Sequence, residues 1–179
     1  IIVALAVRLN DGGPAFFTQE RVGLNGTTFT MFKFRTMRVD AEAMKASLVE
    51  ANEADSSAGN SIMFKMTNDP RITRIGAFLR KTSIDELPQL FNVLRGDMSL
   101  VGPRPPLPSE VAQYEPRVMG KFAVRPGITG LWQISGRSNL SWDETVHLDL
   151  SYAQHRSLTL DAWIMLQTIP ALLRHEGAY

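Results

Sequence analysis

The chain has 179 residues, a length that fits one domain. Hydrophobic residues make up 44% of it, which is enough for a packed core and excludes an intrinsically disordered segment. The formal net charge of +1 argues against a general nucleic-acid-binding protein, and the absence of cysteine excludes disulfides and thiolate metal sites.

The chain opens with an apolar run over residues 1–7, which ends at Arg8. These seven residues cannot cross a bilayer, because a spanning helix needs about 20. The run is therefore either a buried strand or helix end, or the last part of a longer membrane-embedded helix.

Residues 15–37 predict a β-hairpin. Residues 15–22 form its first strand, and the turn over residues 23–26 contains Asn-Gly, which is a strong turn signal. The return strand, residues 27–37, carries apolar side chains on both faces. We therefore expect the hairpin to pack on two sides.

Two helices are predicted to follow the hairpin. Residues 40–52 have a helical pattern, whereas residues 53–61 are rich in Ser, Asn, Asp and Gly and are typical of a loop. Asp69 followed by Pro70 predicts the N-cap and first position of the next helix. Three apolar side chains mark one face of that helix: Ile72, Ile75 and Leu79.

The following helix begins at Ser83 or at Asp85. Ser83 has capping-box spacing to Glu86, whereas Pro88, which is tolerated only in a first turn, favours Asp85 as the cap. Either start places Asp85 at a helix N-terminus, and Gly96 ends the helix. The predicted buried stripe consists of Leu87, Leu90, Phe91 and Leu94.

The rest of the chain is predicted to be mainly helical. The proline-rich segment 102–106 can be neither a regular helix nor a central strand. Ser141 and Glu144 form another capping-box pair, and Thr159 is the expected cap of the last helix. Helices are expected at residues 109–120, 142–154 and 160–174. The predicted fold class is α+β, a mostly helical single domain with an N-terminal β-hairpin.

Asp85 and Glu86 are adjacent carboxylates at a helix start. The helix dipole favours acids in a first turn, so both residues could serve the helix alone. The chemical alternative rests on nearby cations, which could hold a diphosphate: Arg80, Lys81 and Arg104. An aspartate beside such cations stays ionised and can attack phosphorus to form an acyl phosphate. Mg²⁺ would suit one or two carboxylates plus phosphate oxygens.

Other charged residues have both a structural and a functional interpretation. Lys33 and Arg35 end the hairpin's second strand, either as an exposed basic edge or as anion ligands. Arg125 and Arg137 lie in loops with Gly and Pro, where arginine either binds anions or is solvated. Asp161 is typical of a capping acid. The histidines lack metal-ligand spacing and are interpreted as surface or packing residues: His147, His155 and His175.

Five segments in consistent order resemble the bacterial sugar transferases, which are the monotopic phosphoglycosyl transferases, or polyprenyl-phosphate hexose-1-phosphate transferases. The segments are residues 13–23, 29–37 (FTMFKFRTM), 80–89 (RKTSIDELPQ), 96–105 (GDMSLVGPRP) and 125–139 (RPGITGLWQISGRSN). The resemblance extends from about Asp11 to the C-terminus. Several motifs in one order are far more specific than any single motif.

The resemblance implies a role for particular residues. It implies a catalytic dyad of Asp85 and Glu86, with Asp85 as nucleophile and Mg²⁺ (or Mn²⁺) held near both. The substrate- or phosphate-binding residues that match the family's motifs are Lys33, Arg35, Arg80, Arg104 between Pro103 and Pro105, and Asp161. The loop residue Arg125 is also expected to bind substrate or phosphate. Arg137 falls in the family's Gly-Arg-Asn segment, although here Ser138 follows it and Asn139 comes next.

The resemblance also implies a location and partners. Members of the family enter the membrane through a re-entrant helix just before the hairpin. Residues 1–10 would be the end of that helix, and residues 11–179 the catalytic domain on the cytoplasmic face of the bacterial inner membrane. The expected partners are a UDP-sugar, polyprenyl (undecaprenyl) phosphate and membrane lipid, without nucleic acid. A homo-oligomer is left open.

The predicted reaction moves a hexose-1-phosphate from a UDP-sugar to polyprenyl phosphate through a covalent phospho-aspartyl intermediate, with UMP as the second product. The lipid-linked product would begin an exopolysaccharide, capsule or O-antigen unit. Two alternatives stay open: a glycosyl transferase that releases UDP, and an inactive membrane-surface scaffold. No motif reports which sugar is used.

Overall fold

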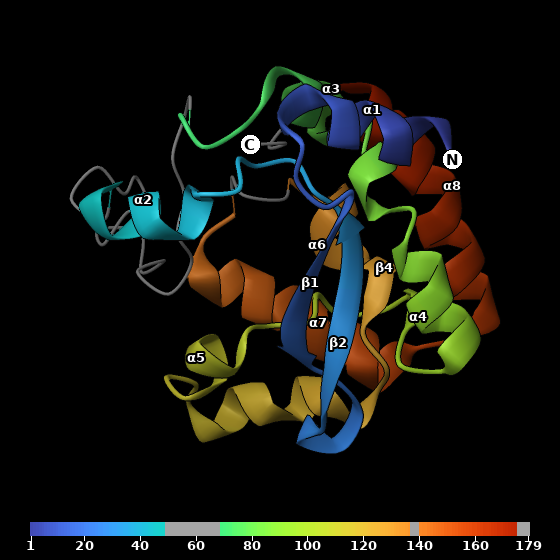
Figure 1. Cartoon of the computed structure of the whole chain (residues 1–179). Coiled ribbons are helices and arrows are strands. Elements are labelled where there is room, and N and C mark those ends of the chain that lie inside the picture. Colours follow the sequence, from blue (N-terminus) through green and yellow to red (C-terminus); the bar gives the residue numbers. More distant parts are fainter. Residues whose placement is uncertain (49–68, 137–139, 175–179) are drawn as a thin grey trace.

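The computed structural model describes residues 1–48, 69–136 and 140–174 (Figure 1). The α-helices among them are α1 (Ile2–Asp11), α2 (Ala41–Leu48), α3 (Arg74–Lys81), α4 (Gln89–Arg95), α5 (Pro108–Val111), α6 (Leu131–Ile134), α7 (Trp142–His155) and α8 (Leu158–Arg174). The 3₁₀ helices are η1 (Leu24–Gly26), η3 (Ile84–Glu86) and η4 (Pro116–Ala123). The strands are β1 (Phe16–Val22), β2 (Thr28–Phe34), β3 (Ser99–Val101) and β4 (Gly127–Thr129). The predicted α+β class is confirmed.

The predicted hairpin is confirmed as the antiparallel pair β1–β2. Its register runs from Phe16 opposite Phe34 to Val22 opposite Thr28. Asn25 and Gly26 both have a positive φ, 55° and 76°, which explains the Asn-Gly pair at this turn.

A second, parallel pair of strands was not predicted. β3 and β4 contribute three residues each, and Val101 lies opposite Thr129. The pairing is tight at Gly127, where an added Cβ would lie 2.1 Å from the backbone nitrogen of Gly102. This sheet joins two of the motif segments and fixes the start of the proline-rich loop that follows β3.

Helix α3 begins later than predicted, and Asp69 is not its N-cap. Thr73 is the cap, since its hydroxyl accepts a 2.9 Å bond from the backbone N–H of Gly76. The side chain of Asp69 pairs instead with Arg71, at 2.6 Å. Asp69 therefore forms a local ion pair with Arg71 and does not cap α3.

The orientation predicted for α4 is wrong. The expected buried stripe is exposed, with Phe91 at 62% and Leu94 at 84%. The buried face instead carries Gln89 and Asn92. Asp85 lies in the first turn of η3, but neither Ser83 nor Asp85 caps a helix with its side chain.

The helix predicted at residues 109–120 is also wrong, because the chain forms α5 and η4 there and η4 begins at Pro116. Helix α7 and its Ser141–Glu144 capping box are confirmed. In α8 the predicted cap Thr159 lies inside the helix, and the hydroxyl of Ser157 accepts the N–H of Leu160 instead. Residues 41–48 confirm part of the helix predicted at 40–52, and the loop predicted at 53–61 lies outside the described residues.

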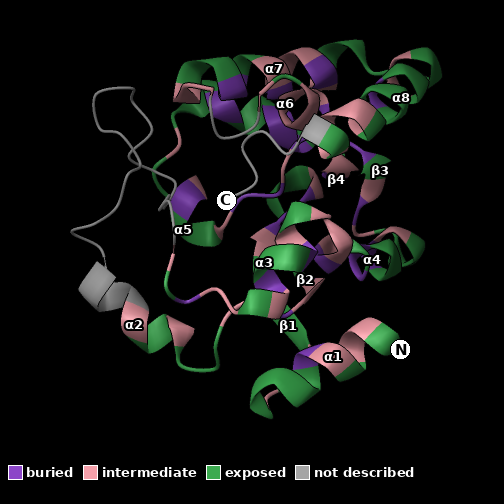
Figure 2. Cartoon of the chain, turned by 90° about the horizontal axis from the view of Figure 1, so that it is seen from above, coloured by how far each residue is buried: buried purple, intermediate pink, exposed green. Residues whose placement is uncertain are grey.

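The core lies where β3, α7 and α8 meet, and its central members are Val101, Val124, Tyr152 and Ile164. Helices α4 and α8 lie on the same side of the molecule in both views (Figures 1 and 2). Unlike the core, they carry many exposed apolar side chains. The opening apolar run is helical, and Ile2, Leu5 and Leu9 of α1 are exposed as well. Across the described ranges, no helix is both long enough and apolar enough to cross a membrane.

Candidate active site

The two carboxylates Asp85 and Glu86 lie in the short helix η3, against strand β2. Lys33 reaches them from β2, and its Nζ lies 2.7 Å from Oε1 of Glu86. The structure therefore brings the strand motif and the dyad motif together, although 53 residues separate the paired side chains in the sequence.

Asp85 is only 8% exposed. Burial raises the pKa of its carboxyl above the ordinary value, the positive charges of Lys33 and Arg80 oppose this rise, and the charge of Glu86 adds to it. Desolvation disfavours the charged form of a carboxyl, whereas cations beside it favour that form. Asp85 thus lies in a buried environment between charged side chains and not at the surface, where a capping acid would lie.

Arg80 comes to the dyad from α3. Its Nε donates a 2.9 Å bond to the hydroxyl of Thr36, just beyond β2. Helix α3 packs so closely there that a Cβ added at Gly76 would lie 1.8 Å from the carbonyl oxygen of Thr36. Burial lowers the pKa of Arg80 and the charge of Asp85 opposes this, so the two charges are electrostatically linked.

Arg104 lies in the loop that follows β3 and forms a two-point ion pair with Glu110. Its Nη1 and Nη2 donate bonds of 3.0 and 3.2 Å to the two carboxylate oxygens. Burial opposes the charge of Arg104, but Glu110 outweighs it and raises the pKa of the guanidinium. Glu110 also accepts the N–H of Leu107 at 2.7 Å, so Arg104 is held in one orientation.

Arg21 of β1 supports the same loop. Its Nη1 donates a 3.0 Å bond to the carbonyl of Pro105, while the carbonyl of Pro103 accepts the N–H of Gly127. Burial, together with the charge of Arg104, lowers the pKa of Arg21 to about 10. The proline frame around Arg104 is therefore fixed by the hairpin on one side and by β4 on the other.

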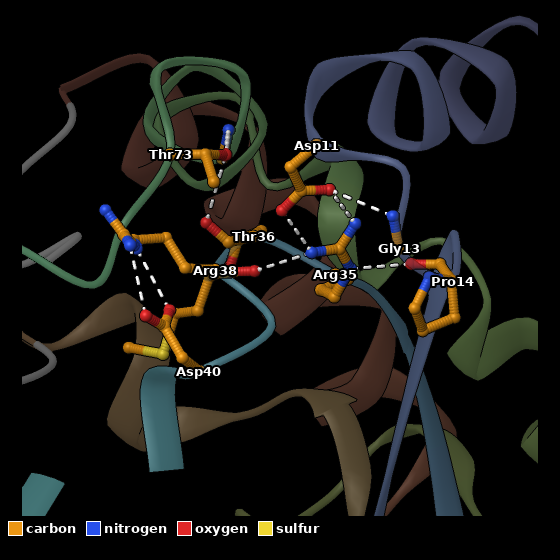
Figure 3. A network of polar contacts seen from close by, with 10 residues as sticks. Asp11, Gly13, Pro14, Arg35, Thr36, Arg38, Asp40 and Thr73 are labelled. Atoms are coloured by element: carbon orange, nitrogen blue, oxygen red, sulfur yellow. Dashed lines mark hydrogen bonds and ion pairs between the residues drawn. The ribbon is translucent and has the colours of Figure 1, made fainter. Parts of the chain in front are cut away.

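Arg35 is predicted to bind substrate, but its contacts in this structure are with the protein itself (Figure 3). Its Nη1 lies 2.6 Å from Oδ2 of Asp11, and its Nε donates a 2.6 Å bond to the carbonyl of Pro14. A further bond reaches the carbonyl of Met37. Arg35 thus ties the end of α1 to the hairpin and to the segment that leads into α2.

The remaining predicted site residues have other partners. Arg125 is exposed and donates a 2.8 Å bond to the carbonyl of Gly96, beyond α4. Asp161 accepts a 2.7 Å bond from the hydroxyl of Tyr152. The structure pairs neither residue with the dyad, and Arg137 lies outside the described residues. Of the two interpretations given for the histidines, His147 and His155 fit the surface one because both are exposed, and His175 also lies outside the described residues.

The family of bacterial sugar transferases matches residues 1–175 of the chain. The chain belongs to this family. It is 52% identical, over 94% of its length, to the galactosyl transferase CpsE of Streptococcus agalactiae. Over 94% it is 46% identical to the undecaprenyl-phosphate galactose phosphotransferase of Salmonella typhimurium. It is also 40% identical, over all of its length, to the UDP-glucose:undecaprenyl-phosphate glucose-1-phosphate transferase of Caulobacter vibrioides. It spans 36%, 35% and 64% of these three relatives.

The dyad of this bacterial sugar transferase has suitable chemistry for the expected Mg²⁺. No group of three or more His, Cys, Asp or Glu side chains in the described part of the chain is placed to hold a metal ion. Asp85 and Glu86 nevertheless provide hard carboxylate oxygens, and Mg²⁺ commonly uses one or two carboxylates plus substrate phosphates. The two residues fit an ion that takes its other ligands from a diphosphate.

Three residues around the site were not singled out in the sequence: Arg21, Asn92 and Glu110. Arg21 and Asn92 act through bonds to segments far away in the sequence, so no local pattern reports them. Glu110 is closer to its partner, since Arg104 and Glu110 are six residues apart across a proline-rich loop. An acid at that distance from a predicted anion-binding arginine is the one signal that could have been used.

Proposed function

We propose that the chain is the catalytic part of a phosphoglycosyl transferase, which moves a hexose-1-phosphate from a UDP-sugar to polyprenyl phosphate. The observation that carries this proposal is the buried Asp85 carboxylate, with Glu86 beside it and the charges of Lys33 and Arg80 acting on it. The names of two relatives support it, since each specifies transfer of a sugar phosphate to undecaprenyl phosphate.

The reaction has two displacements at one phosphorus atom. An oxygen of Asp85 attacks the sugar-bearing phosphorus of the UDP-sugar, the bond from this phosphorus to the bridging oxygen breaks, and UMP leaves with that oxygen. A phosphate oxygen of the polyprenyl phosphate then attacks the same phosphorus. The acyl-phosphate bond breaks, the Asp85 carboxylate is restored, and polyprenyl-diphospho-sugar is released.

Each charged residue has a part in these steps. Burial leaves the Asp85 carboxylate poorly solvated and hence reactive, and Lys33 and Arg80 offset the negative charge that collects around the phosphorus. Arg104 would bind a phosphate in the orientation that Glu110 holds. Mg²⁺ or Mn²⁺, held by Asp85 and Glu86, would lower the repulsion between carboxylate and diphosphate. Glu86 either holds this ion or assists proton transfer.

The proposed location is the cytoplasmic face of the bacterial inner membrane, at the first membrane step of exopolysaccharide, capsule or O-antigen synthesis. Support comes from the exposed apolar side chains of α4 and α8, such as Phe91, Leu94 and Leu166, because a lipid surface covers such side chains favourably. The exposed apolar residues of α1 fit the end of a membrane-embedded helix. The relatives' names include both galactose and glucose, so the sugar is left to experiment.

A glycosyl transferase that releases UDP is the second candidate, because one relative is named a galactosyl transferase. The two reactions differ in the bond that breaks. Transfer of the sugar alone breaks the bond at the sugar carbon and leaves both phosphates on the nucleotide, whereas transfer of sugar phosphate leaves UMP.

The experiment incubates the protein with UDP-glucose or UDP-galactose in the absence of lipid. We expect release of about one UMP per site, with a matching sugar-phosphate mass on the peptide that contains Asp85. Asp85→Asn should abolish both signals, Glu86→Gln should slow them, and excess EDTA should stop them. Asp143→Asn, at an exposed carboxylate, is the matched control and should behave as wild type.

Each alternative outcome has a separate meaning. An adduct on another residue, or wild-type turnover by Asp85→Asn, would refute the assignment of the nucleophile. Release of UDP once lipid is added would favour the glycosyl transferase. A folded protein that releases no nucleotide with any UDP-sugar and lipid would favour the inactive scaffold.

A further inference from the structure

We infer that Asn92 is a positioning residue, whose side-chain amide holds the outer edge of β2 on α4 and so sets Lys33 against the dyad. The inference rests on the proposed function, since it concerns how Lys33 reaches Glu86 and Asp85. It assigns Asn92 no contact with substrate.

Asn92 is fully buried, at 0% exposure, on the face of α4 that packs toward the hairpin. Its Oδ1 accepts a 3.1 Å bond from the backbone N–H of Phe32, and its Nδ2 donates a 2.7 Å bond to the carbonyl of Thr30. The second Nδ2 hydrogen reaches Oδ2 of Asp97 at 3.2 Å. Both hydrogens of the amide and its oxygen therefore have partners.

The two bonds to β2 explain why an amide lies here. In the described chain, the hairpin sheet has only β1 and β2, so the other edge of β2 has no strand beside it. Thr30 and Phe32 present a carbonyl and an N–H on that edge. One planar amide offers both a donor and an acceptor, as a peptide group of a third strand would. A leucine or aspartate would leave at least one of these backbone groups buried and unpaired.

The same bonds connect the strand to the catalytic segment. Lys33 follows Phe32 directly, and η3 with the dyad leads into α4 on the other side. The backbone carbonyl of Asn92 also accepts the N–H groups of Asp97 and Met98, which fixes the end of α4. The amide thus sets the position of β2 along α4, and with it the 2.7 Å contact between Lys33 and Glu86. A misplacement of about 1 Å can slow a reaction by about a hundredfold.

The test is a double-mutant cycle on the rate of the single-turnover adduct. Asn92→Asp keeps the shape but loses both donors, and we expect a rate about tenfold lower with little change in affinity for the UDP-sugar. In a Lys33→Met background the same substitution should change the rate by less than about twofold, because the group that it positions is gone. Multiplicative effects of the two substitutions would overturn the inference.

Two controls separate positioning from general destabilisation. Gln89→Leu removes another buried amide from the same face of α4 and should leave the adduct rate near wild type, whatever its effect on the thermal midpoint. Asn92→Gln keeps the amide on a longer side chain. It should lower the adduct rate less than Asn92→Asp does, and again only where Lys33 is present. If Asn92→Asp does not fold, the cycle with Asn92→Gln decides the result in the same way.

A second readout does not depend on activity. A carbodiimide joins an ammonium and a carboxylate in contact as an amide with loss of water, so wild type should give a Lys33–Glu86 cross-link by peptide mass spectrometry. Folded Asn92→Asp should give a clearly lower yield and Gln89→Leu an unchanged one. An equal yield in folded Asn92→Asp would overturn the inference. Absence of an adduct from wild type would instead count against the proposed function.

Discussion

Lys33 and Arg35 lie two residues apart at the end of β2, and each pairs with an acid. The two acids lie in different regions of the molecule, since Glu86 is in η3 and Asp11 ends α1. Arg35 is 8% exposed and bonds to Asp11 and to two backbone carbonyls. Lys33 is 26% exposed, and Glu86 is its partner among the described residues. One basic side chain holds segments together, and the other supplies a charge to the dyad.

The number and kind of partners explain the difference. A guanidinium bound to fixed backbone groups cannot turn to a substrate without losing those bonds, as the network in Figure 3 makes plain. An ammonium has three donors, and Lys33 uses one of them on the partly exposed side chain of Glu86. A match to a basic motif therefore does not separate a structural cation from a catalytic one, and the different contacts of Lys33 and Arg35 give a distinction that variants can test.

Among the basic residues of this comparison, Lys33→Met is expected to have the largest effect. Loss of a positioned positive charge should slow adduct formation by about a hundredfold, as removal of one donor to a developing charge commonly does. The thermal midpoint should hardly change, because the side chain is partly exposed and its pair with Glu86 contributes little to stability. Single-turnover UMP release measures the rate, and Arg117→Met, at an exposed arginine, is the control. A wild-type rate would show that Lys33, like Arg35, has a structural role only.

Arg35→Met should have the opposite profile. It leaves the carboxylate of Asp11 without its partner, and we expect the free energy of unfolding to fall by about 2 kcal/mol. Urea unfolding measures the loss, and Arg38→Met, which breaks an exposed pair with Asp40, should leave the midpoint unchanged. A hundredfold slower adduct with an unchanged unfolding midpoint would instead place Arg35 at the substrate.

Two local signals predicted the local structure correctly, whereas the helix caps predicted at Asp69 and Thr159 were wrong. Asn25-Gly26 marked the hairpin turn, and the Ser141–Glu144 pair marked the start of α7, because both are decided within four residues. The leucines of α4 lie in a helix, as predicted, but they are exposed and not part of the core. Periodicity reports that a helix has an apolar face, but Leu94 shows that it does not report whether protein or another apolar surface covers that face.

The candidate site was predicted as a set of residues and not as an arrangement. The motif resemblance named Lys33, Arg80 and Asp85 together, and the structure places them so that the charges of Lys33 and Arg80 act on the Asp85 carboxyl. It also named Arg35, whose structural role depends on Asp11 and on backbone carbonyls that no side-chain motif records. Pairings between distant segments depend on the fold, and no local sequence pattern reports them.

Arg104 is intermediate between Arg35 and Lys33, since it is paired with Glu110 but remains partly exposed. The variant Arg104→Ala tests its role. We expect roughly tenfold lower activity, because a charge-assisted bond to phosphate contributes about 1.5 kcal/mol and tenfold corresponds to about 1.4 kcal/mol. Steady-state UMP release with lipid present measures it, with circular dichroism to show that the variant folds. Wild-type activity in a folded variant would make the Arg104–Glu110 pair purely structural.

The smallest effect concerns the stability of Asp85→Asn. Burial raises the pKa of the Asp85 carboxyl in the folded protein above its ordinary value of 3.8, so the folded state binds this proton more tightly than the unfolded state does. Stability from this group is therefore greatest at acid pH and declines as pH rises from the ordinary value through the folded value. Asparagine has no such decline.

At neutral pH, Asp85→Asn should consequently be more stable than wild type, although we expect it to be inactive, and the gap should shrink as pH falls toward 4. Urea unfolding in EDTA at several pH values measures this difference without a bound metal ion. Asp161→Asn is the matched control, because it removes a carboxylate that accepts a bond from Tyr152 and should lower stability at neutral pH. If Asp85→Asn is the less stable protein at neutral pH, Asp85 belongs with Arg35 among the residues that hold the fold together. A gain in stability would show that the charge of Asp85 lowers the stability of the fold, whereas the charge of Arg35 supports it.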